Sequence, residues 1–169
     1  TLWVTWQLEG GAAAVNEAGR MRMQTWRLAQ TLPSQDGQRL KDQLEQFEQT
    51  LSLLRTGDAA RPLLVPRDVR SQRAFAEVQQ NWLQLRAAWA AGTPPAAAAV
   101  STQAEVFVAR IDAFVTAIET QLARWTTLLN AFQFVMMALA IGSAIAMLYS
   151  AYLFVFNPRS RLQTGLARV

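Results

Sequence analysis

Apolar side chains recur at intervals of three and four residues along most of this chain, a spacing that predicts α-helices. Four helices are expected, over residues 1–32, 37–56, 68–91 and 96–156. Proline, glycine and polar residues predict turns between them, at 33–37, 57–67 and 92–95. Helices of this length joined by turns pack alternately up and down, so the pattern predicts an all-α protein built on an antiparallel four-helix bundle.

Each predicted helix after the first carries one apolar stripe, which we assign to the core. These stripes are Leu40, Leu44, Phe47, Leu51 and Leu54, then Val69, Phe75, Val78, Trp82, Leu85 and Trp89, and finally Phe107, Ile111, Phe114, Ile118, Leu122, Trp125, Leu129 and Phe132. The second helix also carries the acidic side chains Asp42, Glu45 and Glu48. Pairing of these carboxylates with Arg20 or Arg27 of the first helix across the bundle is the structural alternative to a ligand role for those two arginines.

The end of the last helix is a candidate membrane span, because residues 131–156 contain no charged side chain and are long enough to cross a core of roughly 30 Å. Residues 1–8 are apolar and rich in tryptophan, and we interpret them as the outer end of a first transmembrane helix. The bundle domain then covers residues 9–130. The alternatives are the start of a soluble helix at 1–8 and a buried core helix of a soluble protein at 131–156.

The excess of basic side chains is concentrated at the end of the chain. Residues 1–156 hold 13 basic and 12 acidic side chains, whereas 157–169 hold three arginines and no acid. The basic tail therefore marks the cytoplasmic end of the span by the positive-inside rule. No broad cationic face remains for duplex DNA, so we do not expect nucleic-acid binding.

The composition also bears on catalysis and metals. The chain contains no His and no Cys, so an imidazole base, a thiolate nucleophile and a phosphorylated histidine are all excluded from it. The acidic residues show no metal-ligand spacing, and no phosphate-binding loop or nucleophile motif is present. We therefore expect no enzyme activity, no metal and no cofactor in this segment.

The first helix holds an unusual cation. On a helical projection one sector consists of Leu8, Ala12, Val15, Gly19, Arg22 and Trp26, and a second of Ala14, Ala18, Met21, Leu28 and Leu32. Arg22 is the one charged residue of its sector, and no acid stands three or four residues from it. If this stripe faces its own copy across a two-fold axis, two Arg22 guanidinium groups converge, and a small oxyanion would fit between them. The alternative is that Arg22 reaches water or pairs with an acid on another helix.

The same stretch carries a resemblance to a known family. Asn16, Ala18, Gly19, Arg22, Met23, Gln24, Arg27 and Leu28 match the P-box of nitrate/nitrite sensor histidine kinases. The chain is similar to the sensor module of that family and of the related pilus-type chemotaxis transducers. It departs from the P-box pattern at Arg20, Met21, Thr25 and Trp26.

The resemblance implies a membrane-bound homodimer in the bacterial inner membrane, with a periplasmic sensor domain that holds nitrate or nitrite between paired Arg22 side chains beside Gly19. Candidate supporting residues are Val15, Arg20, Met23 and Trp26. Residues 157–169 look like the start of a HAMP linker, which would pass a helix displacement to a cytoplasmic histidine kinase and its response regulator. The alternatives are a methyl-accepting chemotaxis-type transducer and a membrane-anchored helical scaffold that binds a protein partner.

Overall fold

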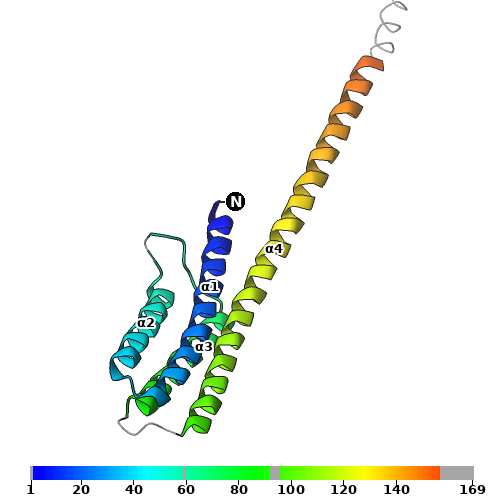
Figure 1. Ribbon diagram of the computed structural model, residues 1–169. Helices are drawn as coiled ribbons and strands as arrows, with labels where there is room; N and C mark the ends of the chain where they lie inside the picture. The colour runs from blue at the N-terminus through cyan, green and yellow to red at the C-terminus, as the bar shows by residue number, and fades with distance from the viewer. Residues whose placement is uncertain (1, 59, 92–95, 157–169) are drawn as a thin grey trace, which may run out of the picture. The chain divides into compact units, whose positions relative to one another are not determined.

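The computed structural model describes residues 2–58, 60–91 and 96–156, and within them it contains helices and no strand (Figure 1). The helices are α1 (Leu2–Thr31), the short 3₁₀ helix η1 (Leu32–Ser34), α2 (Gly37–Thr56), α3 (Val69–Ala90) and α4 (Ala97–Phe156). In Figure 1, α1 and α3 run in one direction while α2 and the first half of α4 run in the other. The predicted all-α class and the four packed helices are confirmed.

Local capping explains where α2 and α3 begin and where α2 ends. The carboxylate of Asp36 accepts a hydrogen bond from the backbone N–H of Arg39 at 3.1 Å, and Asp68 does the same for Ser71 at 3.0 Å. Both satisfy donors that a helix N-terminus leaves free. Gly57 ends α2 with φ of 79°, a left-handed conformation that glycine adopts without strain. These signals lie in the sequence, so the predicted bounds of α2 and α3 agree closely with the structure.

The end of α1 differs slightly from the expectation. The regular helix stops at Thr31, and Pro33 lies within η1 rather than beyond a helix that ends at residue 32. A proline is tolerated in the first turn of a new helix because no amide hydrogen is needed there. The predicted turn at 92–95 and the predicted HAMP linker at 157–169 lie outside the described residues.

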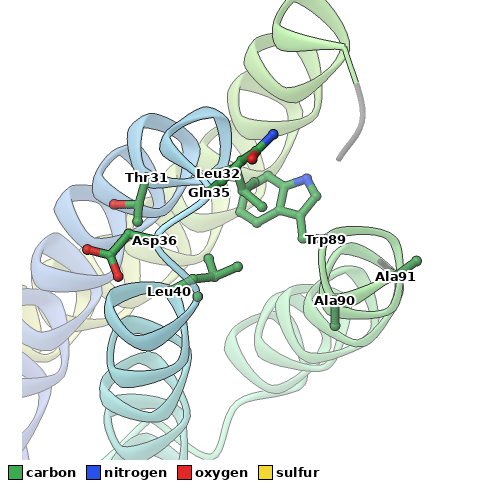
Figure 2. Close-up of a pocket in the computed structure, with 9 residues that line it drawn as sticks. Thr31, Leu32, Gln35, Asp36, Leu40, Trp89, Ala90 and Ala91 are labelled. Carbon is green, nitrogen blue, oxygen red and sulfur yellow. The ribbon is translucent and has the colours of Figure 1, made fainter. Parts of the chain in front are cut away.

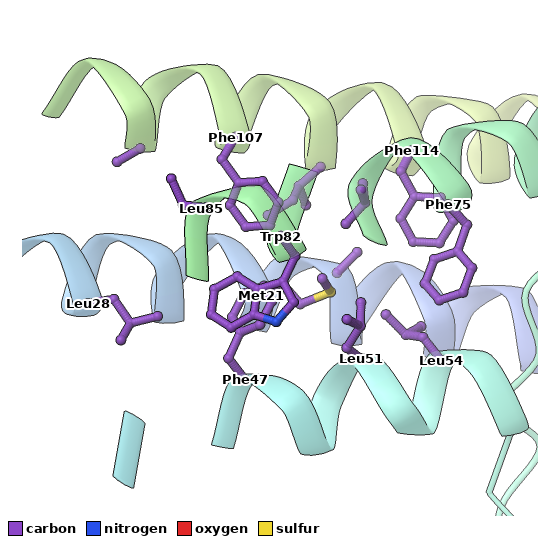
Figure 3. Close-up of a cluster of buried hydrophobic side chains, with 14 of the residues drawn as sticks. Met21, Leu28, Phe47, Leu51, Leu54, Phe75, Trp82, Leu85, Phe107 and Phe114 are labelled. Atoms are coloured by element: carbon purple, nitrogen blue, oxygen red, sulfur yellow. The ribbon is translucent and has the colours of Figure 1, made fainter. Parts of the chain in front are cut away.

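The core of the bundle is formed by side chains from all four helices (Figure 3). Phe47 of α2 stacks on Trp82 of α3, with ring centroids 4.0 Å apart, and Phe107 of α4 packs against both rings. Met21 of α1 is fully buried beside them. The four helices therefore share one hydrophobic core, which holds α1 in a defined rotation.

The chain divides into two compact units, with the boundary after Trp125. The second unit, as far as it is described, is the apolar end of α4, whose side chains from Ala131 to Phe156 are all exposed. Within the described residues α4 is the one helix that is long and apolar enough to cross a membrane. The transmembrane assignments at 1–8 and 131–156 and the homodimer stay predictions.

Candidate functional site

The two sectors of α1 have different surroundings in the structure. Ala14, Ala18, Met21 and Leu28 are buried and form the core face of α1. The sector that contains Arg22 points outward, and its members are half-buried or exposed. None of the residues of the predicted ligand stripe is therefore fully buried, although Val15 packs against the edge of the core.

Arg22 has a carboxylate partner on another helix. Its Nη1 atom lies 2.9 Å from Oδ1 of Asp112 on α4, and the two side chains are 46% and 50% exposed. The sequence leaves two possibilities for Arg22, a site facing a second copy and a pair with an acid on another helix. The structure of one chain shows the second of these. An ion pair this exposed contributes at most about 1 kcal/mol to stability. Arg22 is thus held by α4 only weakly.

Gly19 lies beside the guanidinium of Arg22. A Cβ atom added to Gly19 would meet only Nη2 of Arg22, at 4.0 Å, so the surface there is open. Met23 and Trp26 are exposed, whereas Val15 is half-buried against the core. Of the candidate residues the structure brings Gly19 and Arg22 together.

Arg20 is separated from that pair. Its Nη1 atom lies 3.7 Å from Oε1 of Glu17, which is on its own helix. The structural alternative, pairing of Arg20 or Arg27 with an acid of α2, is not seen among the ion pairs of the described residues. Glu48 instead binds Arg86 of α3 at 2.5 Å, and Asp42 accepts a hydrogen bond from Gln38. The rotation of α2 turns Glu48 toward α3, which the spacing alone does not reveal.

A buried carboxylate within the same motif was not predicted. The side chain of Glu17 is 1% exposed, and its Oε1 atom lies 2.5 Å from Nη2 of Arg61, in the segment between α2 and α3. In the same segment, the backbone N–H of Leu64 donates a hydrogen bond to the carbonyl of Gly10 at 3.2 Å. The connection between α2 and α3 is therefore bound to α1 at two points, Gly10 and Glu17.

The electrostatics of this connection follow from its hydrogen bonds. The bonds to Glu17 and then to Asp58 raise the pKa of Arg61 above its ordinary value. The backbone N–H of Ala60 and then Arg61 lower the pKa of Asp58, against a smaller opposing effect of burial. These hydrogen bonds thus favour the charged forms of Arg61 and Asp58 beside the buried side chain of Glu17. Only Glu17 is withdrawn from water, so it is the group that depends most on its partner.

We expect Arg61→Met to lower the midpoint of thermal unfolding clearly, because it leaves the Glu17 carboxylate buried with only the exposed Arg20, at 3.7 Å, as a cationic partner. The matched control is Arg110→Met, which breaks an ion pair with Glu77 whose two side chains are both about half exposed. That change should be close to neutral. Equal shifts for the two variants, measured by circular dichroism, would show that the Glu17 contact has no special weight.

A separate cavity of about 390 Å³ lies where η1 meets the start of α2 and the end of α3 (Figure 2). Leu32, Leu40 and the ring of Trp89 form its apolar side, and Gln35 and Asp36 add polar atoms. The indole N–H of Trp89 donates to Gln103 of α4 at 2.8 Å. No residue of the predicted site lines this cavity.

Comparison with known proteins gives one family. No curated protein matches the chain. The model of the PilJ family, the N-terminal domain of type IV pili methyl-accepting chemotaxis transducers, matches residues 3–114. This match covers α1, α2, α3 and the start of α4, and it supports the relationship to pilus-type transducers while adding nothing specific to nitrate or nitrite. The chain, a four-helix module whose last helix continues as an exposed apolar segment, belongs to the PilJ family of chemotaxis-transducer N-terminal domains.

Proposed function

We propose that this chain is the sensor segment of a membrane-bound chemotaxis-type transducer. The observation that carries the proposal is the continuity of α4, which runs without a break from the bundle core at Phe107 to the exposed apolar stretch that ends at Phe156. Membership of the PilJ family supports the same function. In this proposal the bundle receives a signal and α4 carries it onward, and the segment itself performs no catalysis.

The membrane assignment rests on the surface of the second unit. Leu139, Ile145, Leu148 and Phe154 are among many large apolar side chains that stay exposed there, which is unfavourable in water and favourable in hydrocarbon. Near the start of α1, the ring of Trp3 meets that of Trp125 at 5.5 Å, and tryptophan is enriched at membrane interfaces. With the basic tail in the cytoplasm, the bundle lies on the periplasmic side of the inner membrane.

A small oxyanion such as nitrate or nitrite is the candidate ligand, held between the Arg22 side chains of two copies. The outward position of the Arg22 sector favours this hypothesis, because Ala12, Arg22 and Trp26 are exposed and can face a second copy. Asp112 then acts as an internal competitor, since a carboxylate and an oxyanion require the same guanidinium. An anion bound at Arg22 would release Asp112 and so alter the contact between α1 and α4.

The test uses a hybrid receptor in which residues 9–169 replace the sensor domain and second membrane segment of a chemotaxis receptor with known kinase output. We expect nitrate or nitrite to change the output, Arg22→Ala to abolish that response, and Asp112→Ala to lower the concentration needed. Arg110→Ala is the control for loss of an exposed arginine. If the output changes with these anions equally in the Arg22→Ala hybrid, the site is elsewhere.

The downstream partner distinguishes the two signalling alternatives. The PilJ match favours a methyl-accepting chemotaxis module over a histidine kinase with its response regulator. A helical scaffold that binds a protein partner would use the same bundle but would show no ligand-dependent output. The hybrid receptor separates the scaffold from both sensors.

A further inference from the structure

A polar groove of about 240 Å³ lies between α1 and α2, which pack side by side (Figure 1). The groove is lined by Gln24, Arg27, Arg39, Asp42, Gln43 and Gln46. Its volume is several times the share of one water molecule, about 30 Å³, and is below the range of drug-sized pockets. The groove is therefore of a size for a small polar molecule.

Gln24, one of the residues that line the groove, carries an unpaired acceptor atom. The Thr50 hydroxyl donates its hydrogen to the carbonyl of Gln46 at 3.1 Å, so the Thr50 oxygen can only accept from Gln24. Gln24 must then turn its amide nitrogen toward Thr50, at 3.3 Å. This orientation leaves Oε1 of Gln24 buried and without a donor in the described part of the chain.

Gln43, a second residue that lines the groove, also carries an unpaired acceptor atom. Oε1 of Gln43 is also buried, and no donor reaches it from the residues that the structure describes. Buried polar atoms are normally paired, and leaving one unpaired is costly. Gln24 and Gln43 both line the groove, so a molecule with N–H or O–H donors would satisfy these two oxygens once the side chains turn toward it.

The groove also offers cationic donors. Arg27 and Arg39 are exposed, and among residues 2–58, 60–91 and 96–156 neither forms an ion pair. Asp42 is the acid of the groove, and one of its oxygens accepts from Gln38 at 3.0 Å. Two guanidinium groups favour a carboxylate, while the amide oxygens and Asp42 favour an ammonium group.

We propose that this groove binds a small zwitterion, a free α-amino acid, with its carboxylate at Arg27 and Arg39 and its ammonium group at Gln24, Gln43 and Asp42. A simple anion brings no donor for the two glutamine oxygens, and a simple cation faces two arginines. The amino acid satisfies both sets of groups at once. This site is separate from the Arg22 sector, whose partner is on α4.

Calorimetric titration of the purified chain in detergent with individual L-amino acids tests the proposal. We expect at least one amino acid to bind once per chain, and acetate and methylammonium, which each carry half of its charges, to bind at least about tenfold more weakly. Absence of heat with every amino acid, or equal binding of acetate, would overturn it.

Substitutions of groove residues test whether the amino acid binds in this groove. Arg39→Ala and Gln43→Leu should each weaken amino acid binding about tenfold or more, and Gln43→Leu should leave the weak binding of acetate unchanged. The control Arg73→Ala removes an exposed arginine of α3, and Arg22→Ala removes the proposed oxyanion site, so both should keep full affinity. Circular dichroism checks that each variant is folded. Loss of binding in Arg22→Ala with retention in Arg39→Ala would contradict the groove and leave the Arg22 hypothesis standing.

Discussion

Replacement of Trp82 by alanine is expected to destabilise the bundle by about 3–5 kcal/mol, the usual cost of removing a large buried aromatic side chain. Trp82 is 1% exposed and packs against both Phe47 and Phe107, so its removal leaves a cavity that three helices would have to close. The measurement is unfolding of the purified chain followed by its helical circular dichroism. A loss below about 1 kcal/mol would mean that the bundle core is not organised around this ring.

Trp82→Phe is the matched control for that prediction. The indole N–H of Trp82 is buried without a hydrogen-bond partner in the described residues. Phenylalanine removes this unpaired donor and keeps an aromatic ring against Phe47, so we expect a much smaller loss than for alanine. If phenylalanine cost as much as alanine, the cavity would not be the cause.

The double substitution Ala140→Arg with Ala144→Arg is expected to prevent insertion of α4 into a membrane. The two residues lie one turn apart in the middle of the uncharged stretch. Each arginine at the centre of a membrane helix costs roughly 2.5–3.5 kcal/mol, so the pair opposes insertion by about 5–7 kcal/mol. The measurement is the share of protein that stays in carbonate-washed membranes.

The control for this prediction places two arginines in the part of α4 that belongs to the bundle. Thr102 and Val106 are exposed and also lie one turn apart, so Thr102→Arg with Val106→Arg should leave membrane retention unchanged. Full retention of the Ala140→Arg and Ala144→Arg protein would show that α4 does not span the bilayer.

The helices and most of the core could be predicted from the sequence, because caps and apolar periodicity act locally. Asp36 and Gly57 fix the ends of α2, and Phe47 and Phe107 are buried as their spacing predicts. Val69 is an exception at 78% exposure, since it stands at the first position of α3, where the stripe has not yet reached the core. Phe132 is exposed because it lies beyond the bundle unit.

The polar contacts of the site could not be predicted, because they depend on how separate segments are rotated and where the long connection runs. Asp112 lies ninety residues from Arg22, and nothing in the pattern of α4 marks it as a partner. Glu17 looks like an ordinary helical glutamate in the sequence, and only the structure shows that its side chain is buried and paired with Arg61. The outward direction of Arg22 likewise follows from the core that α1 shares with α2, α3 and α4.

The central claim is that α4 carries the signal from the bundle to the cytoplasmic side, and insertions after Thr127 test it most directly. In the hybrid receptor each added alanine rotates the apolar segment by about 100° against the bundle, and seven restore nearly two full turns. We predict that kinase output changes with one to three insertions and returns toward its original value with seven. An output that is the same for every insertion length would contradict transmission through this helix.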